Sequence, residues 1–112
     1  MNEIDQSIDV DGLSRAFAAS PTPLLLDVRR REIFEKESHM IPGAIWCDHE
    51  EVVLFVTERL EQGRRIFVYC VHGHEISQGA QAQLSKNGFD VKFLTGGFEA
   101  WQEAGRPLAS RK

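Results

Sequence analysis

Short apolar runs alternate with amphipathic segments along most of the chain, and this alternation restricts the possible folds more than any other feature. The runs LLLDV (24–28) and RIFVYC (65–70) are almost continuously apolar, as are strands that are buried on both faces of a parallel sheet. Other segments carry apolar residues three or four positions apart, which is the spacing of amphipathic helices. The sequence therefore predicts an α/β fold, with a central, mostly parallel sheet of about five strands and helices on both faces.

The remaining elements follow from residues that cap or end helices. A short strand in 7–10 precedes a helix that we expect to begin near its N-cap Asp11 and to end before Pro21 and Pro23. A turn with a short helix is expected over 29–38. The elements predicted after it are a strand within 41–46, a helix over 48–63 capped by Asp48 and stopped by Gly63, a helix over 76–88 stopped by Gly88, a strand over 91–94, and a helix over 98–105 with Phe98 and Trp101 facing the core.

Length, charge and apolar content exclude several classes of protein. The 112 residues suffice for one compact domain, so we expect a single domain over 1–112. The formal net charge is −4, whereas nucleic-acid binding requires a basic face, so no nucleic-acid partner is expected. Apolar stretches of about five residues are far shorter than the roughly 20 residues of a membrane span, so no membrane association is expected either.

The N-terminal segment starts acidic and has no apolar block, so no signal peptide is visible and a cytoplasmic location is expected. In a reducing compartment the two cysteines, Cys47 and Cys70, are expected to be free thiols. A free thiol serves as a buried packing residue, as a metal ligand or as a nucleophile. The surroundings of each cysteine have to decide between these roles.

Cys70 follows a predicted strand, and the loop after it leads into a predicted helix. Ligands of open α/β sheets bind beyond the carboxyl ends of the strands, which is where Cys70 is expected. The unpaired N–H groups of a helix N-terminus, together with its partial positive charge, favour a thiolate or a bound oxyanion. Gly73 allows the loop to turn sharply and to direct its N–H groups inward. These features predict a thiolate nucleophile in a cradle of backbone N–H groups.

Four segments in one order add a family resemblance to this interpretation. They are LLLDVR (24–29), HMIPGAIW (39–46), VYCVHGHE (68–75) and LTGGFEAWQEAGRPL (94–108). Each alone is a weak signal, but their order and their spacing over a domain-sized chain are specific. Together they resemble the rhodanese family, in particular its single-domain sulfurtransferases, over nearly the whole chain.

The resemblance implies a rhodanese-like fold and a sulfurtransferase in which Cys70 carries sulfane sulfur as a persulfide. The implied donor is a small anion such as thiosulfate or another persulfide, and the implied acceptor is cyanide or a thiol, including a thiol of a partner protein. No metal and no organic cofactor is implied. The loop that would stabilise the anionic donor, thiolate and persulfide consists of Val71, His72, Gly73, His74, Glu75 and Ile76.

Two other functions compete with sulfur transfer. Phosphatases on this fold place five residues between their cysteine and an arginine that binds phosphate, but here that position is Ile76 and the loop has no arginine. Phosphatase activity is therefore not expected. A binding or redox-sensing module that keeps the fold and uses Cys70 without turnover is the alternative that stays open.

A metal site is a further alternative for the cysteines and histidines. The sets Cys47-x-His49 and Cys70-x-His72-x-His74 hold atoms that zinc binds. Neither set has the two-residue separation of a zinc knuckle, so no metal is expected. Cys47 is interpreted as a packing residue that would act on an oxidised Cys70 only if the two side chains approach each other.

Glu75 departs from the pattern of the family, whose members commonly carry arginine or lysine in this loop. A carboxylate near the site opposes ionisation of a thiol and repels an anionic donor. We hypothesise that Glu75 weakens the use of thiosulfate and biases the site toward another donor or acceptor. His72 and His74 either support the loop through hydrogen bonds or lie exposed in solvent.

Asp27 and Arg29 lie two residues apart at the end of a predicted strand, on the same side of it. Both are candidates for support of the site. The preferred interpretation has Arg29 anchoring the scaffold through a carboxylate such as Glu32 or Glu35. His39 is interpreted as a turn residue, because one extra residue separates it from the Ile-Pro-Gly segment.

Overall fold

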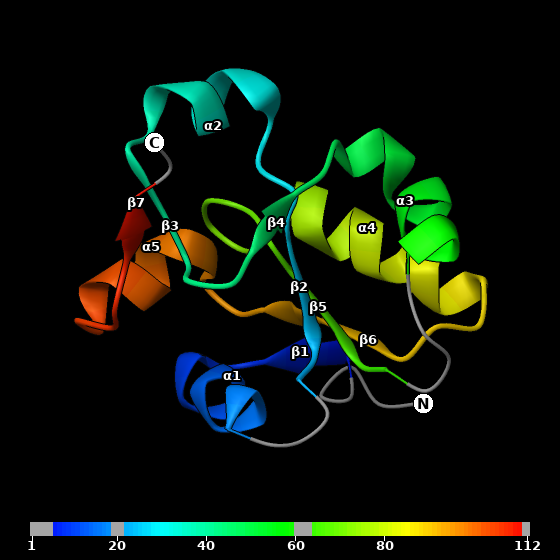
Figure 1. Cartoon of the computed structure of the whole chain (residues 1–112), viewed down its shortest axis with the longest axis horizontal. Helices are drawn as coiled ribbons and strands as arrows, with labels where there is room; N and C mark the ends of the chain where they lie inside the picture. Colours follow the sequence, from blue (N-terminus) through cyan, green and yellow to red (C-terminus); the bar gives the residue numbers. More distant parts are fainter. Residues whose placement is uncertain (1–5, 19–21, 60–63, 111–112) are drawn as a thin grey trace.

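The computed structural model describes residues 6–18, 22–59 and 64–110, and Figure 1 shows a central sheet between helices. Five strands form this sheet in the order β1-β6-β5-β2-β4, and every neighbouring pair is parallel. Because parallel neighbours need crossover connections, helices separate most of the strands in sequence. The predicted α/β fold with its parallel sheet is confirmed. The strands are β1 (Ser7–Ile8), β2 (Leu24–Asp27), β4 (Ile45–Trp46), β5 (Ile66–Tyr69) and β6 (Val91–Leu94).

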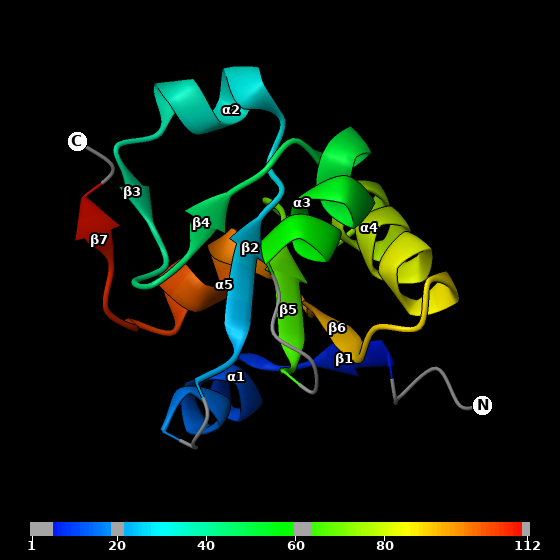
Figure 2. The same cartoon turned by 45° about the vertical axis from the view of Figure 1, so that its right-hand side comes forward.

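Helices cover both faces of the sheet, with α3 and α4 on one face and α1 and α5 on the other (Figures 1 and 2). A shorter helix, α2, follows the carboxyl end of β2 and contributes no buried residue to the core. Within the described ranges, no helix combines the length and the apolar character that crossing a bilayer requires. The bounds are α1 (Val10–Phe17), α2 (Arg31–Lys36), α3 (Val52–Arg59), α4 (Glu75–Lys86) and α5 (Gly97–Glu103).

The start of α1 differs from the sequence prediction, which placed its N-cap at Asp11. The cap is Asp9, whose carboxylate accepts a hydrogen bond of 2.7 Å from the N–H of Gly12. Its extended backbone lets the side chain reach the N–H three residues further along, which is the geometry of a cap. Asp11 therefore lies in the first turn of the helix.

Of the other helix ends that the sequence predicted, only some lie within the described residues. Asp48 does cap a helix, because its carboxylate accepts from the N–H of Glu50 at 2.9 Å, but that helix is a 3-10 turn that leads into α3. Helix α4 ends at Lys86, shortly before Gly88, as expected. The predicted terminators Pro21 and Gly63 lie outside the described residues.

A small antiparallel pair, β3 (His39–Met40) and β7 (Ala109–Ser110), stands apart from the main sheet. His39 was expected in a turn, and this expectation was wrong. The strand exists because a segment some 70 positions further along the chain supplies its hydrogen-bonding partner. Such a distant partner leaves no signal in the residues around His39.

Side chains that alternate along the two central strands fill two separate cores, as period-2 strand geometry requires. The alternation continues one residue past β5, so Cys70 belongs to the core under α3 and α4, whereas the preceding Tyr69 belongs to the other core. Strand residues on the side of α3 and α4 are Leu24, Leu26, Ile66 and Val68, and those on the side of α1 and α5 are Leu25, Phe67 and Tyr69.

A buried ion pair closes the carboxyl end of β2. The Nη2 atom of Arg29 lies 2.6 Å from Oδ2 of Asp27, and the two side chains are 1% and 0% exposed. The Tyr69 hydroxyl donates to the same carboxylate at 2.9 Å. Burial, and after it the charge of Asp27, raises the pKa of Tyr69 above its usual range, so the hydroxyl remains a donor. Arg29 therefore anchors the scaffold, but its partner is Asp27 and not Glu32 or Glu35, since residues two apart on an extended chain face the same side.

Arg29 also connects three segments that are distant in sequence. Its Nη2 donates to the carbonyl of His39 at 3.1 Å, and its own carbonyl accepts from Nε1 of Trp46 at 2.9 Å. The guanidinium lies 4.5 Å from the centre of the Phe98 ring. The pair with Asp27 thus holds β3, β4 and α5 around the end of β2.

We predict that Asp27→Asn strongly destabilises the protein, because it leaves the Arg29 guanidinium buried without its counter-charge. The expected loss in the free energy of unfolding is about 3–5 kcal/mol, measured by urea denaturation at neutral pH. The matched control is Glu32→Gln, which makes the same chemical change on an exposed residue and should cost less than about 1 kcal/mol. A loss of the same small size in Asp27→Asn would contradict the central role of the pair.

Candidate functional site

Cys70 lies directly after β5, at the carboxyl edge of the sheet, with its side chain buried. Its Sγ lies 3.2 Å from Oγ of Ser77, and the two atoms form a hydrogen bond. Ser77 is fully buried in the first turn of α4. Because a hydroxyl both accepts and donates, Ser77 can accept from the thiol and can turn to donate to a thiolate. Sequence reasoning missed Ser77, although a serine near the start of the following helix was the available signal.

The loop after Cys70 packs directly against the backbone at the start of α5. Gly73 has φ of +75°, and a Cβ there would lie 2.7 Å from the backbone nitrogen of Gly96. Gly97 has φ of +63°, and a Cβ there would collide with the carbonyl oxygen of Cys70. Both positions therefore require glycine for conformation and for space. Sequence reasoning assigned the turn to Gly73 and did not foresee its contact with Gly96 and Gly97.

Three hydrogen bonds fix the carbonyl groups of this loop. The N–H of Phe98 donates to the carbonyl of Cys70 at 2.8 Å, and the N–H of Glu99 donates to that of Val71 at 3.0 Å. The amide Nε2 of Gln78 donates to the carbonyl of Gly73 at 2.9 Å. The first turn of α5 and one side chain of α4 thereby hold the loop in place from two sides.

The N–H groups of the same loop are unpaired. From Val71 to Ile76, none of the backbone N–H groups donates a hydrogen bond to any residue in the described part of the chain. Consecutive unpaired N–H groups at a helix N-terminus form a concave donor array that suits an anion. These N–H groups are therefore available as donors, and the predicted cradle for an anion around Gly73 stays a prediction.

A cavity of about 300 Å³ opens next to Cys70 and is called the Cys70 cavity below. It is lined by residues of the predicted loop and by residues around the start of α2. Gly73 does not line it, and Asp27 lies behind it as the partner of Arg29. The lining residues are Arg29, Arg30, Ile33, Cys70, Val71, His72, His74, Glu75 and Ile76.

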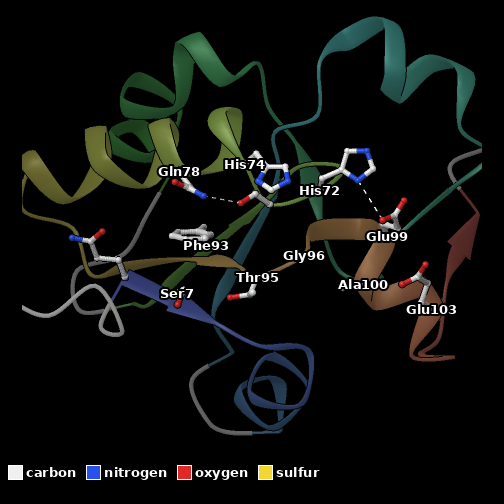
Figure 3. Close-up of a pocket in the computed structure, with 12 residues that line it drawn as sticks. Ser7, His72, His74, Gln78, Phe93, Thr95, Gly96, Glu99, Ala100 and Glu103 are labelled. Carbon is white, nitrogen blue, oxygen red and sulfur yellow. Dashed lines mark hydrogen bonds and ion pairs between the residues drawn. The ribbon is translucent and has the colours of Figure 1, made fainter.

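A second, larger cavity of about 800 Å³ lies on the other side of the loop, between β1, β6 and α5 (Figure 3). His72 and His74 border both cavities, so the loop forms the wall between them. The Nδ1 atom of His72 lies 3.4 Å from Oε1 of Glu99, and both side chains are 54% exposed. The two histidines are therefore surface groups at the rim and not buried supports of the thiol.

Cys47 lies in a different environment, directly after β4. Its side chain is 4% exposed, and its Sγ donates to the carbonyl of Asp48 at 3.4 Å. Burial raises the pKa of the Cys47 thiol to about 11, and the charges of Asp48 and Glu51 act in the same direction. Cys47 is a packing residue with a poorly ionised thiol, as expected. Trp46, beside it, stacks on Phe34 at a ring distance of 5.4 Å.

The residue sets considered for zinc do not converge. Among the described residues, the only three ligand-type side chains whose atoms lie within 4.8 Å of one another are Asp48, His49 and Glu50. These three lie near the protein surface, and the group contains neither cysteine. The chemistry that the geometry around Cys70 supports is therefore attack by a thiolate on an anionic or polarised partner, with backbone N–H groups as the stabilising donors.

Comparisons with known proteins identify relatives of the chain. The family model described as the rhodanese-like domain matches residues 9–104. The thiosulfate sulfurtransferase GlpE of Vibrio cholerae is 33% identical over 102 residues, which are 90% of this chain and 92% of that protein. The structure of a rhodanese-related protein of Thermoplasma volcanium matches with a TM-score of 0.77 at 27% identity, covering 93% of this chain and 97% of that one. An Anabaena protein matches with a TM-score of 0.77 at 33% identity, covering 91% and 81%.

We predict opposite effects of alanine at two glycines. Gly97→Ala should lower the free energy of unfolding by about 2 kcal/mol or more, because its Cβ meets the Cys70 carbonyl at a positive φ. Gly79→Ala, within α4, meets open space and should raise the free energy by about 0.5–1 kcal/mol. Urea denaturation of both variants checks this. Equal effects would show that the loop tolerates a side chain at Gly97.

We also predict that Cys47 reacts slowly with iodoacetamide in the folded protein. With a pKa of about 11, its thiolate fraction should be about a hundredfold below that of an ordinary thiol near neutral pH. In the Cys70→Ser variant, where only Cys47 remains, the labelling rate should rise about tenfold per pH unit between about pH 8 and 10. A rate that levels off within that range, in protein that circular dichroism shows to be folded, would contradict the raised pKa.

Proposed function

The chain belongs to the rhodanese-like domain family, and from this premise we propose that it is a sulfurtransferase that carries sulfane sulfur as a persulfide on Cys70. The observation that carries the proposal is the position of the Cys70 thiol beside Ser77 and a loop of unpaired N–H groups. Relatives named thiosulfate sulfurtransferase, matched over most of their length, support the same activity. We further propose that residues 1–112 form one domain that acts in the reducing cytoplasm, where Cys70 stays a free thiol.

In the first step the Cys70 thiolate attacks the outer sulfur of thiosulfate. A new S–S bond forms on Cys70, the original S–S bond breaks, and sulfite leaves with the electron pair of that bond. Thiosulfate, thiolate and persulfide all carry negative charge, so the same donors serve each state. The N–H groups from Val71 to Ile76 and the hydroxyl of Ser77 are these donors.

In the second step an acceptor removes the sulfur. A thiolate or cyanide attacks the outer sulfur of the persulfide, and the electron pair of the broken S–S bond returns to Cys70. The products are a new persulfide or thiocyanate together with the starting thiolate. The reaction conserves electrons between donor and acceptor and needs neither a metal nor an external oxidant.

The absence of a guanidinium clamp argues for sulfur over phosphoryl transfer. The loop from Cys70 to Ile76 contains no arginine. Arg29 lines the Cys70 cavity, but its guanidinium is committed to the buried pair with Asp27. A transferring phosphoryl group would thus lack an arginine within the loop that follows the cysteine, and the remaining arginine of the cavity, Arg30, stands outside that loop, before α2.

We predict that incubation with thiosulfate adds one sulfur atom to the protein, as measured by intact mass. Cys70→Ser should remain unmodified, whereas Cys47→Ser should be modified as the wild type is, because its thiol is not the carrier. Cyanide should then restore the original mass and yield thiocyanate. A wild-type protein that takes up sulfur from neither thiosulfate nor an inorganic polysulfide would overturn the proposal in favour of a binding or redox-sensing module.

A further inference from the structure

Two unpaired charges of opposite sign line the Cys70 cavity. Arg30 stands immediately before α2, and Glu75 is the first residue of α4. Both side chains are exposed, and neither forms an ion pair or a hydrogen bond with any residue that the structure describes. The neighbouring Arg29, in contrast, is neutralised by Asp27. The cavity therefore offers one free cation and one free anion to a ligand.

The walls between these charges are apolar. Ile33 on α2 is 45% exposed, and with Val71 and Ile76 it lines the cavity beside Cys70. The volume of about 300 Å³ is at the lower end of the range for small organic ligands, which runs from about 300 to 1,000 Å³. A compact dianion such as thiosulfate can use Arg30 and the loop N–H groups, but it gains nothing from the apolar walls and is repelled by Glu75. The cavity suits a ligand that has a short aliphatic part and charges of both signs.

We propose that the sulfur acceptor is a small zwitterionic amino-thiol. Its ammonium group binds the carboxylate of Glu75, its carboxylate binds the guanidinium of Arg30, and its carbon atoms lie against Ile33 and Ile76. This orientation brings its sulfur to the persulfide on Cys70. The inference rests on the proposed function and extends it by naming the class of acceptor and the two residues that select it.

The transfer step balances without a further reactant. The thiolate of the amino-thiol attacks the outer sulfur of the Cys70 persulfide, and a new S–S bond forms on the acceptor. The old S–S bond breaks, and its electron pair remains on Cys70 as a thiolate. The product is the persulfide of the amino-thiol, and Arg30 and Glu75 orient the acceptor without taking part in bond making.

A purely structural role of Glu75 predicts a different outcome. A carboxylate in the first turn of a helix is stabilised by the helix dipole, and this effect is independent of the acceptor. Binding of an ammonium group, in contrast, makes the effect of Glu75 depend on which charges the acceptor carries. The experiment must therefore compare acceptors and not only variants.

The test loads wild-type protein with inorganic polysulfide, removes the excess, and follows loss of the persulfide by rapid-quench mass spectrometry. Four acceptors are compared: cysteine, cysteamine without the carboxylate, 3-mercaptopropionate without the ammonium group, and 2-mercaptoethanol with neither. Rates are expressed per thiolate so that differences in thiol acidity cancel. The variants are Glu75→Gln and Arg30→Gln. Their matched controls are Glu32→Gln and Arg31→Gln, which change charge outside the cavity.

Glu75→Gln should slow transfer to cysteine and cysteamine by about three- to tenfold and should not slow transfer to 3-mercaptopropionate. Arg30→Gln should slow transfer to cysteine and 3-mercaptopropionate to a similar extent and should not slow transfer to cysteamine. Neither control should reproduce this pattern. Slower transfer that depends in this way on the charges of the acceptor would support the proposal. A change in net charge alone would not explain it, because the control variants change the net charge equally.

Two results would overturn the inference, and they differ in what they leave standing. If Cys70 accepts sulfur but each variant affects the four acceptors equally, or only as its control does, the choice of acceptor class is wrong and the sulfurtransferase proposal survives. If wild-type Cys70 accepts sulfur from neither polysulfide nor thiosulfate, both proposals fail together.

Discussion

The buried guanidinium of Arg29 connects the scaffold to the carboxyl edge of the sheet, where Cys70 lies. It neutralises Asp27 at the end of β2, and the same carboxylate accepts from Tyr69, the residue before Cys70. On its other side it lies over the ring of Phe98, whose N–H holds the carbonyl of Cys70. The partners of the Arg29 guanidinium thus hold Cys70 in place from two sides, through β5 and through α5. Because an unpaired buried charge is costly, removal of either partner of this pair would destabilise the fold and the surroundings of Cys70 together.

The sequence predicted what is determined locally and missed what depends on distant partners. Continuous apolar runs identified β2 and β5 because strands buried on both faces leave no room for polar alternation. The resemblance to the rhodanese family, carried by four ordered segments, was confirmed. Pairing of His39 with a C-terminal strand and the contact of Gly73 with Gly97 were not foreseen, because neither partner is visible in the neighbouring residues. The N-cap of α1 was missed by two residues, since both Asp9 and Asp11 satisfy the compositional rule.

The two cysteines are buried to a similar extent but have different polar neighbours. Both side chains are almost fully buried, at 4% for Cys47 and 6% for Cys70. Cys47 donates to a main-chain carbonyl, and burial, followed by the charges of Asp48 and Glu51, raises the pKa of its thiol. Cys70 meets the hydroxyl of Ser77 and a loop with unpaired N–H groups. Their exposed fractions alone would not distinguish the two thiols, whereas the hydrogen-bond partners of each sulfur do.

In the loop after Cys70 the carbonyl groups accept hydrogen bonds from the protein, whereas the N–H groups have no acceptor among the described residues. The carbonyl groups of Cys70, Val71 and Gly73 accept hydrogen bonds from α5 and from Gln78, and these bonds use none of the loop's own N–H donors. The N–H groups from Val71 to Ile76 stay available as donors. The exposed side chain of Glu75 takes no part in the hydrogen bonds that hold this loop, so its charge can change without breaking them. Under the proposed function, the backbone donors would stabilise the sulfur, and the exposed side chains around the Cys70 cavity would select the acceptor.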